Sequence, residues 1–410
     1  MIKIRQDFPS LGIVELEKEI KKALITSNLN QVIRVGMRVG ITVGSRGIKN
    51  IAPILKETVA YVRYLGGSPV MIASMGSHGG GTPAGQKKLL HSLGIAEENI
   101  GAPVVCSIDC VEIGQGSHGK IYLNLEALKC DAIIVVNRIK PHTSFHGDHE
   151  SGLLKMLAVG LGGPPGAASL HRCRPRLLSQ AVAETGLAVL KAAPVVLGLA
   201  ILEDAHEQTC KIVPICPEKI YEEEKILLRE ARDYLPGLPV SDLDVLIVDW
   251  IGKNFSGTGM DTNVIGRLRI HDLPEPESPR INRIVVLDIA PEAHGNAYGI
   301  GLADFTTERL VSKLDRDSVY LNALTSTFVQ RAMLPMTLPN DREAIKAAFL
   351  SLGTTFQEDA KVIRIHDTLH LSEMLVSENV FHELSNLPFI QDLGQWGELE
   401  FNSRGDLLPF

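Results

Sequence analysis

Histidines gather in one glycine-rich segment near the middle of the chain. Residues 137–172 read NRIKPHTSFHGDHESGLLKMLAVGLGGPPGAASLHR and follow an apolar run, residues 132–136, that predicts a buried strand. Four of the thirteen histidines lie in this segment: His142, His146, His149 and His171. Loops that carry so many titratable groups are usually functional, so this segment is the first candidate for an active site.

Three kinds of chemistry are available to these side chains. An imidazole transfers protons near neutral pH, so His142 is a candidate acid or base. Lys155 follows Ser-Gly at the start of an apolar helical pattern, where a lysine is unusual unless it is paired or used covalently. His171, sixteen residues later, could ligate a borderline metal such as nickel or zinc. The spacing of His142, His146 and His149 could equally indicate a zinc or iron site.

Two further polar loops each follow a short apolar run. Residues 44–47 read GSRG, and residues 75–83 read MGSHGGGTP. Their glycines allow backbone N–H groups to approach an anion, and Arg46 adds a bidentate donor for a carboxylate or phosphate. His78 is a second candidate for proton transfer, which could face one substrate from the side opposite His142. Neither loop matches a dinucleotide or nucleoside triphosphate motif, and tight turns without a ligand would also explain either loop alone.

The elements that must position these loops alternate between strand and helix. Apolar runs at 39–43, 70–73 and 132–136 predict strands, whereas residues 51–65 and 83–93 have the spacing of helices. This rhythm predicts an α/β fold with a mostly parallel sheet flanked by helices. Ligands of such sheets bind beyond the carboxyl ends of the strands, so we expect the three loops to meet at one edge.

A proline-rich stretch, LPGLPVSDLD, predicts a domain boundary near residues 236–239. We expect an N-terminal catalytic and cofactor-binding domain over 1–237 and a C-terminal α/β domain over 238–410, with the active site in the cleft between them. The remaining expected helices are 176–191, 220–235, 303–314, 320–333 and 341–350, and the remaining expected strands are 195–201, 244–249, 283–288 and 362–365.

The composition argues against nucleic-acid-binding, membrane-spanning and secreted proteins. The net charge of -7, the aromatic content of 5% and the lack of a basic block argue against nucleic acid as a partner. No apolar run reaches the roughly 20 residues of a membrane span. The N-terminus lacks the apolar core of a signal peptide, and the six cysteines form no metal-binding or disulfide pattern. We therefore expect a cytoplasmic protein with reduced thiols.

These loops resemble those of a known family, the nickel-dependent lactate racemases, which use a nickel-pincer nucleotide cofactor. The resemblance covers most of the chain and is most specific in KPH…G…SG..K, followed by a histidine sixteen residues later. It implies that Lys155 attaches the cofactor covalently and that His171 ligates nickel. It also implies that His78 in GSHGGGT and His142 in KPHTSFHG are acid and base on opposite faces of the substrate, which Arg46 holds.

The same resemblance implies the rest of the site and the reaction. The loop residues that contact the cofactor would be Ser45, Gly76, Ser77 and Gly79, and the segment SGTGMDTNVIGRLR would close over the site. One histidine removes the hydroxyl proton of a 2-hydroxy acid while the C2 hydrogen passes as hydride to the cofactor. Hydride then returns to the other face of the planar 2-keto acid. The implied partners are the 2-hydroxy acid and the enzymes that make the cofactor.

Two departures from the family lie in the first domain. The family has a DxTR pattern at the first-loop arginine, whereas Val43, Gly44 and Ser45 precede Arg46 in this chain, so the acid is missing. The distance from His142 to Lys155 is about three residues longer than in the family. This insertion brings the additional histidines His146 and His149.

A third departure lies in the second domain and concerns the substrate. The family's Tyr-Gln pair and a later lysine correspond to Ile265, Gly266 and Arg269. Arg269 could still bind a carboxylate, whereas the loss of Tyr and Gln removes polar contacts and makes room. We therefore expect a 2-hydroxy acid larger than lactate, or a sugar acid. We expect His146, Asp148 and His149 of the insertion to contact this substrate.

Two other classes of function compete with this hypothesis. The first is a conventional metal-dependent hydrolase or lyase that uses the cluster of His142, His146 and His149 directly. The second is a binding protein that keeps the fold without catalysis. A binding protein has no need of two loop histidines together with a lysine and a metal-ligating histidine, so the enzyme is favoured.

Overall fold

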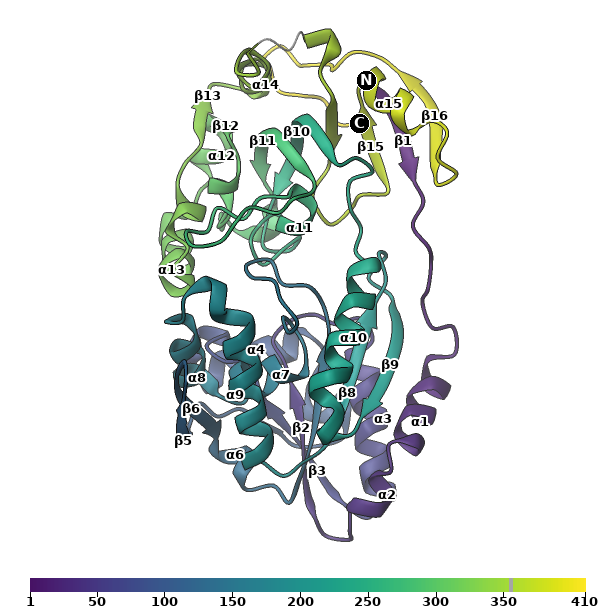
Figure 1. Ribbon diagram of the computed structural model, residues 1–410, viewed down its shortest axis with the longest axis vertical. Coiled ribbons are helices and arrows are strands. Elements are labelled where there is room, and N and C mark those ends of the chain that lie inside the picture. Colours follow the sequence, from purple (N-terminus) through teal and green to yellow (C-terminus); the bar gives the residue numbers. More distant parts are fainter. Residues whose placement is uncertain (354–356) are drawn as a thin grey trace. The chain divides into compact units, whose positions relative to one another are not determined.

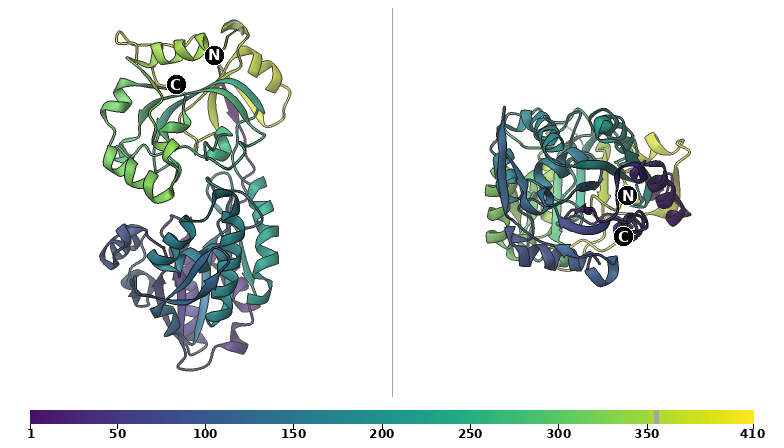
Figure 2. Two further views of the ribbon diagram at one scale, coloured as in Figure 1. Left: turned by 60° about the vertical axis from the view of Figure 1, so that its left-hand side comes forward. Right: turned by 90° about the horizontal axis from the view of Figure 1, so that it is seen from below.

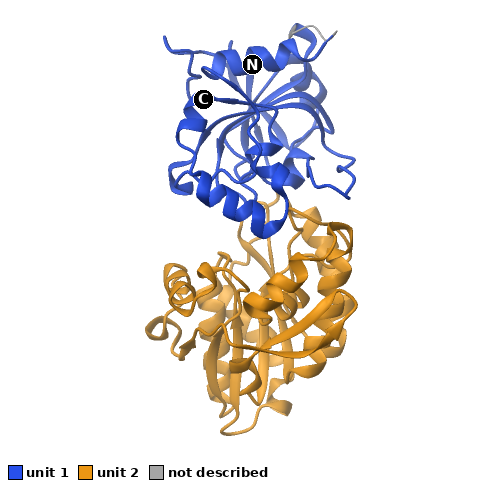
Figure 3. Ribbon diagram, turned by 90° about the vertical axis from the view of Figure 1, so that its left-hand side faces the viewer, with its two compact units in different colours: residues 1–8, 236–410 blue, residues 9–235 orange. Residues whose placement is uncertain are grey.

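The computed structural model describes residues 1–353 and 357–410, which divide into two compact units (Figure 3). Residues 9–235 form the histidine-loop unit, and residues 1–8 with 236–410 form the mixed-sheet unit. We expected residues 1–8 to belong to the N-terminal domain. Strand β1 (Ile2–Gln6) instead pairs with β15 and β16 of the mixed-sheet unit.

The histidine-loop unit contains a six-stranded sheet of order β4-β3-β2-β7-β8-β9 (Figure 1). Every neighbouring pair is parallel except β8 and β9. A separate hairpin joins β5 and β6. The strands are β2 (Arg38–Val43), β3 (Ser68–Ala73), β4 (Val104–Val105), β5 (Cys110–Gly116), β6 (Gly119–Asn124), β7 (Ala132–Arg138), β8 (Val195–Glu203) and β9 (Thr209–Ile215).

Helices cover both faces of this sheet because its strands are apolar on both sides (Figure 2). Val39 and Ile41 of β2 pack in a core with α1 and α3, whereas Ile133 and Val135 of β7 pack in a core with α7, α9 and α10. The helices are α1 (Leu16–Thr26), α2 (Leu29–Val32), α3 (Ile51–Tyr64), α4 (Pro83–Ser92), α5 (Glu97–Ile100), α6 (Leu125–Leu128), α7 (Leu153–Lys155), α8 (Gly163–His171), α9 (Leu178–Ala192) and α10 (Ile220–Asp233), with short turns η1 (Gly79–Gly81), η2 (Met156–Gly160), η3 (Pro175–Leu177) and η4 (Pro217–Lys219).

The mixed-sheet unit contains an eight-stranded sheet of order β13-β12-β11-β10-β14-β15-β1-β16. The first five strands of this order, from β13 through β12, β11 and β10 to β14, pair in parallel. The remaining pairs, β14 with β15, β15 with β1 and β1 with β16, are antiparallel. Besides β1, its strands are β10 (Asp242–Ile251), β11 (Arg280–Ile289), β12 (Phe305–Thr307), β13 (Met336–Leu338), β14 (Val362–Ile365), β15 (Glu373–Val376) and β16 (Ile390–Trp396). Its helices are α11 (Thr262–Ile265), α12 (Glu308–Ser312), α13 (Arg316–Ser326), α14 (Asp341–Leu350) and α15 (Glu378–Leu384), with turns η5 (Pro291–Ala293), η6 (Ile300–Leu302), η7 (Val329–Ala332) and η8 (Gln357–Asp359).

The mixed-sheet unit is also apolar on both faces of its sheet. Leu246 and Val248 of β10 pack in one core with α11 and α15, and Val245 and Ile247 pack in a second core with α14. The structure therefore confirms the predicted α/β class, with mostly parallel sheets flanked by helices. The longest described helix, α9, has 15 residues, and none of the described helices is both long and apolar enough to cross a membrane.

The predicted helix over 303–314 is wrong in its first half. Residues Phe305–Thr307 form β12 between β11 and β13, and only Glu308–Ser312 are helical. The hydroxyl groups of Thr306 and Thr307 are fully buried and donate to main-chain carbonyls of β11, at 2.9 and 2.8 Å. Sheet pairing of these β-branched residues outweighs the weak helical spacing.

Replacing Ile4 with alanine should destabilise the mixed-sheet unit, since Ile4 is fully buried in its core. A cavity of this kind costs roughly 2–5 kcal/mol. Hydrogen exchange measured by mass spectrometry should then be faster in β15 and β16 and unchanged in β2. Arg5→Ala is the matched control, because Arg5 on the same strand forms only a partly exposed ion pair with Glu373. Faster exchange confined to β2 would contradict the assignment of β1 to this unit.

Candidate active site

The three polar loops meet at one edge of the sheet in the histidine-loop unit. Strand β2 lies between β3 and β7 and is parallel to both, so the carboxyl ends of all three strands share an edge (Figure 1). The Ser45 hydroxyl after β2 contacts Nδ1 of His78 after β3. This contact brings the two glycine-rich loops together, as the strand pattern predicts.

The helical segment that follows Lys155 packs against the loop after β3. Met156–Gly160 form a π-helical turn directly after Lys155, a distortion that is common at functional sites. A side chain at Gly160 would lie 2.8 Å from the carbonyl oxygen of Ser74, so only glycine permits this approach. Gly76 has a φ of 57° and packs against Val159. Two glycines therefore allow the loop and the helix to touch.

A buried carboxylate orders the loop between β7 and α7. The side chain of Glu150 is fully buried and accepts hydrogen bonds from the His142 N–H at 2.5 Å, the Gly147 N–H at 3.0 Å and Arg232 at 2.6 Å. Burial alone would raise the pKa of Glu150, but hydrogen bonds from His146, from the His142 main chain and from Arg232 lower it below its ordinary value. Glu150 thus stays ionised and holds His142 in place.

Glu150 is not among the site residues that the sequence predicts. It lies beside Asp148 in the motif HGDHE, and acidic residues in polar loops are common. No local signal separates the buried carboxylate from the exposed one, because burial depends on Arg232 of α10, which lies 82 residues away.

The imidazole of His142 is held by its neighbours in the same loop. It stacks on Phe145 with ring centroids 4.3 Å apart, and its Nδ1 accepts a hydrogen bond from the Ser144 N–H at 3.0 Å. An accepting Nδ1 places the proton of the neutral ring on Nε2. In this tautomer Nε2 of His142 carries the hydrogen and can donate a hydrogen bond to a ligand.

Lys155 lies against the same phenylalanine, with Nζ 5.4 Å from the centroid of the Phe145 ring. Burial, and to a smaller extent the positive charge of Arg46, lower the pKa of Lys155 to about 7, while Glu150 opposes the shift. A substantial fraction of the amine is therefore uncharged at neutral pH. An uncharged amine is a nucleophile, whereas an ammonium is not.

His171 ends α8 and interacts electrostatically with Lys155. Burial lowers the pKa of His171, and the charge of Lys155 lowers it further. The imidazole is therefore neutral at physiological pH. Neutral imidazole is the form that ligates a metal ion.

His78 lies exposed in the loop after β3, as expected for a residue that meets a ligand. Its contact with Ser45 gives Ser45 a second function besides the predicted cofactor contact, because the hydroxyl orients the imidazole. The predicted cofactor-binding residues Gly76, Ser77 and Gly79 surround His78 in the chain and precede α4.

His149, which we expected to contact substrate, supports α7 instead. It is 2% exposed, its Nδ1 lies 3.3 Å from Oε1 of Glu224, and its ring lies 4.5 Å from that of Tyr221. The other oxygen of Glu224 accepts the N–H of Leu154 at 3.0 Å. The buried pair thereby joins α10 to the beginning of the helix that carries Lys155.

The other members of the expected substrate-binding group lie at the surface of the loop. His146 is exposed and lies 3.4 Å from Glu150, and Asp148 is exposed and lies 3.9 Å from Lys225. Within residues 1–353 and 357–410, His142, His146 and His149 do not form a group with ligand atoms close enough for one metal ion. Nothing in the geometry therefore favours the hydrolase or lyase built on that cluster.

Arg269, the substrate-binding residue expected in the mixed-sheet unit, forms hydrogen bonds and an ion pair within that unit. Arg269 donates to the carbonyl oxygens of Gly301 and Ala303 at 2.6 and 3.1 Å and pairs with Asp304 at 2.6 Å. Ile265 is fully buried in the core. The spacing in the sequence gives no indication of these long-range contacts.

Comparison with known proteins shows which solved structures share this fold. No family model and no curated protein sequence matches the chain. The structure of the lactate racemase apoprotein from Thermoanaerobacterium thermosaccharolyticum matches with a TM-score of 0.52 and 13% identity, over 90% of this chain and 98% of the other. A structural-genomics target protein from Thermotoga maritima matches with a TM-score of 0.53 and 13% identity, over 87% of this chain and 97% of the other. The chain thus has a fold similar to that of lactate racemase.

The low pKa of Lys155 predicts its reactivity. In the cofactor-free protein, acetylation of Lys155 by acetic anhydride should reach half its maximal rate near pH 7, because only the free amine reacts. Lys120 is the control, since its hydrogen bond to Glu112 raises its pKa. Arg46→Gln should move the Lys155 midpoint upward by removing a positive charge. Peptide mass spectrometry measures both rates, and coincident pH profiles for the two lysines would contradict the lowered pKa of Lys155.

Proposed function

We propose that this protein is a racemase or epimerase of a 2-hydroxy acid that acts with a nickel-pincer nucleotide attached at Lys155. The observation that carries the proposal is the pair formed by Lys155 and His171. Loss of hydration lowers the pKa of both groups, and the charge of Lys155 lowers that of His171 further, which supports the proposal that the two residues share one site. The fold similar to that of lactate racemase agrees with this proposal.

The donor groups fit the proposed cofactor. An uncharged Lys155 amine can attack an activated acyl or thioacyl carbon, and a neutral His171 imidazole suits nickel, a borderline metal. When bound, the cofactor would supply a hydride acceptor next to the substrate. The glycine-rich loop at Gly76 and Gly79, with α4 behind it, offers main-chain N–H groups for the nucleotide phosphate.

The order of the strands suggests how an acid and a base could approach one substrate from opposite faces. Arg46 follows the middle strand β2, His78 follows β3 on one side of it, and His142 follows β7 on the other. We assign the substrate carboxylate to Arg46, whose guanidinium suits bidentate binding. His78 and His142 would then approach from opposite sides, one as base for the hydroxyl proton and the other as acid.

We propose a substrate larger than lactate, or a sugar acid, from the residues that replace the family's Tyr-Gln pair. Ile265 and Gly266 provide no polar side chain at those positions. When enantiopure 2-hydroxy acids are compared as substrates, those longer than three carbons should racemise fastest. Fastest turnover of lactate would overturn this part of the proposal and leave the reaction class intact.

Separate variants should distinguish attachment of the cofactor from retention of its metal. In protein produced together with the cofactor-making enzymes and nickel, Lys155→Ala should lose the covalent mass increase. His171→Ala should keep the organic adduct but lose nickel, because one ligand is removed while the attaching amine remains. Denaturing intact-mass spectrometry and elemental analysis of the native protein measure the two properties. An unchanged mass increase in Lys155→Ala would disprove the attachment.

Replacing either loop histidine should slow racemisation in both directions by roughly 10²–10⁴-fold, because one full turnover uses both an acid and a base. Each variant should still oxidise the enantiomer that faces its remaining histidine. Acid quenching after one turnover, with assay of the 2-keto acid, should reveal opposite preferences for His78→Ala and His142→Ala. His91→Ala changes an exposed histidine of α4 and should match the unmodified protein. Identical preferences in the two variants would refute the assignment.

A further inference from the structure

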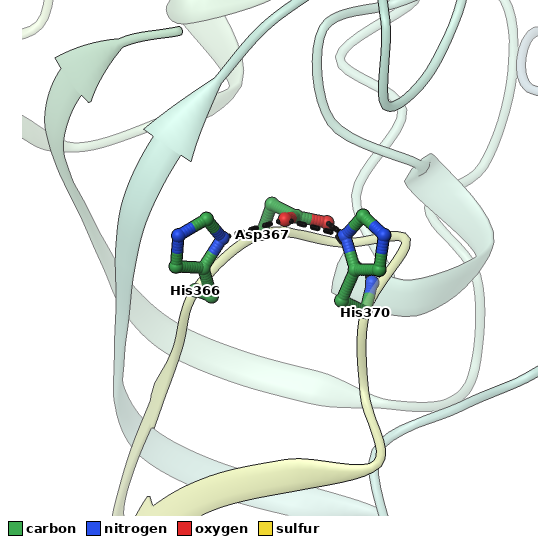
Figure 4. A group of neighbouring side chains, drawn as sticks. All are labelled: His366, Asp367 and His370. Atoms are coloured by element: carbon green, nitrogen blue, oxygen red, sulfur yellow. Dashed lines mark hydrogen bonds and ion pairs between the residues drawn. The ribbon is translucent and has the colours of Figure 1, made fainter. Parts of the chain in front are cut away.

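A second group of potential metal ligands lies in the loop after β14 of the mixed-sheet unit. Figure 4 shows His366 and His370 on either side of Asp367. Nδ1 of His366 lies 2.8 Å from Oδ2 of Asp367, and Nδ1 of His370 lies 2.8 Å from the same oxygen. Two imidazoles from one short loop therefore converge on a single carboxylate oxygen.

The burial of this carboxylate needs an explanation. The Asp367 side chain is fully buried, whereas those of His366 and His370 are 56% and 66% exposed. Its Oδ1 accepts the N–H groups of Leu369 and His370 at 2.7 and 2.9 Å. In the part of the chain that the structure describes, its only ionisable partners are the two histidines, and no lysine or arginine pairs with it. Buried carboxylates are usually paired with a cation or coordinate a metal.

The three donor atoms lie close enough together to share one small cation. One donor atom from each of the three residues lies within 4.8 Å of the others. Ligands about 2.1 Å from a zinc ion lie a little more than 3 Å apart, so small rotations of the two exposed imidazoles would suffice. Two imidazole nitrogens and one carboxylate oxygen are donors that zinc and nickel accept.

The position in the fold also favours a ligand site. The loop follows β14, which is parallel to β10, so it lies at the carboxyl edge of the parallel strands. Trp250 at the end of β10 lies near His366, with ring centroids 6.4 Å apart, and Phe255 in the next loop lies 6.0 Å from His370. An aromatic ring thus lies near each of the two imidazoles.

We propose that His366, Asp367 and His370 bind one divalent transition-metal ion through both Nδ1 atoms and the Asp367 carboxylate, with the remaining positions open to water or a ligand. Zinc or nickel is the expected class of metal. This site lies in a different unit from His171 and does not depend on the proposed reaction. It adds a metal to the chain whether or not the nickel-pincer nucleotide is used.

The test uses tag-free, cofactor-free full-length protein in the His171→Ala background, which removes the proposed nickel ligand. Titration with zinc chloride against a chromophoric chelator should reveal one bound equivalent. His366→Gln together with His370→Gln should eliminate that equivalent. The matched control is His382→Gln, since His382 is similarly exposed and lies 3.6 Å from Glu378 but belongs to no group of three potential ligands among the described residues. Equal zinc binding in the double variant and the control would overturn the proposal, as would the absence of a bound equivalent in the background protein.

Two further measurements locate the metal and guard against misfolding. Copper(II) quenches nearby indole fluorescence, so binding should quench Trp250, and Trp250→Phe should remove the quenching while zinc binding persists. Asp367→Asn keeps an oxygen for the two main-chain N–H groups but loses the charge, so it should weaken zinc binding at least tenfold. Circular dichroism should show that each variant is folded. Quenching that persists in Trp250→Phe, or full affinity in a folded Asp367→Asn variant, would contradict the site.

Discussion

Burial of the Lys155 amine is the constraint on which the rest of the candidate site depends. An ammonium ion loses most of its hydration when it is buried, so its pKa falls to about 7 and the amine becomes reactive. The close approach between Gly160 and Ser74 permits this burial, because it brings the helix after Lys155 against the neighbouring loop. Arg46 strengthens the effect, and Glu150 limits it.

Carboxylates, rather than the additional histidines, organise the longer loop between β7 and α7. Glu150 binds main-chain N–H groups and Arg232, and Glu224 binds the N–H of Leu154 and the ring of His149. Both acids are buried and therefore need several hydrogen-bond donors. Glu150 of this loop thus supports His142, and Glu224 of α10 supports the helix that carries Lys155. A histidine-rich insertion need not be a metal site when acids compete for its imidazoles.

The two units use the same property of parallel sheets. In each, residues that follow the carboxyl ends of neighbouring strands are brought to one edge, where loops are free to vary without disturbing the core. The histidine-loop unit places Arg46, His78 and His142 there, and the mixed-sheet unit places His366 and His370 there. The difference lies in the acid, since Asp367 contacts both imidazoles directly whereas Glu150 mainly holds the main chain.

The sequence by itself determined the elements whose spacing is strong and local. The strands β2, β7 and β14 and the helices α3 and α14 follow from apolar periodicity, and the glycine-rich loops after strands identify the candidate residues. Only the tertiary structure decided the place of β1, the strand β12, the burial of Glu150 and the pairing of His149 with Glu224. These depend on partners far away in the chain, such as the 75 residues that separate His149 from Glu224. Local patterns carry no information on such partners, and the pKa of Lys155 depends on the same long-range packing.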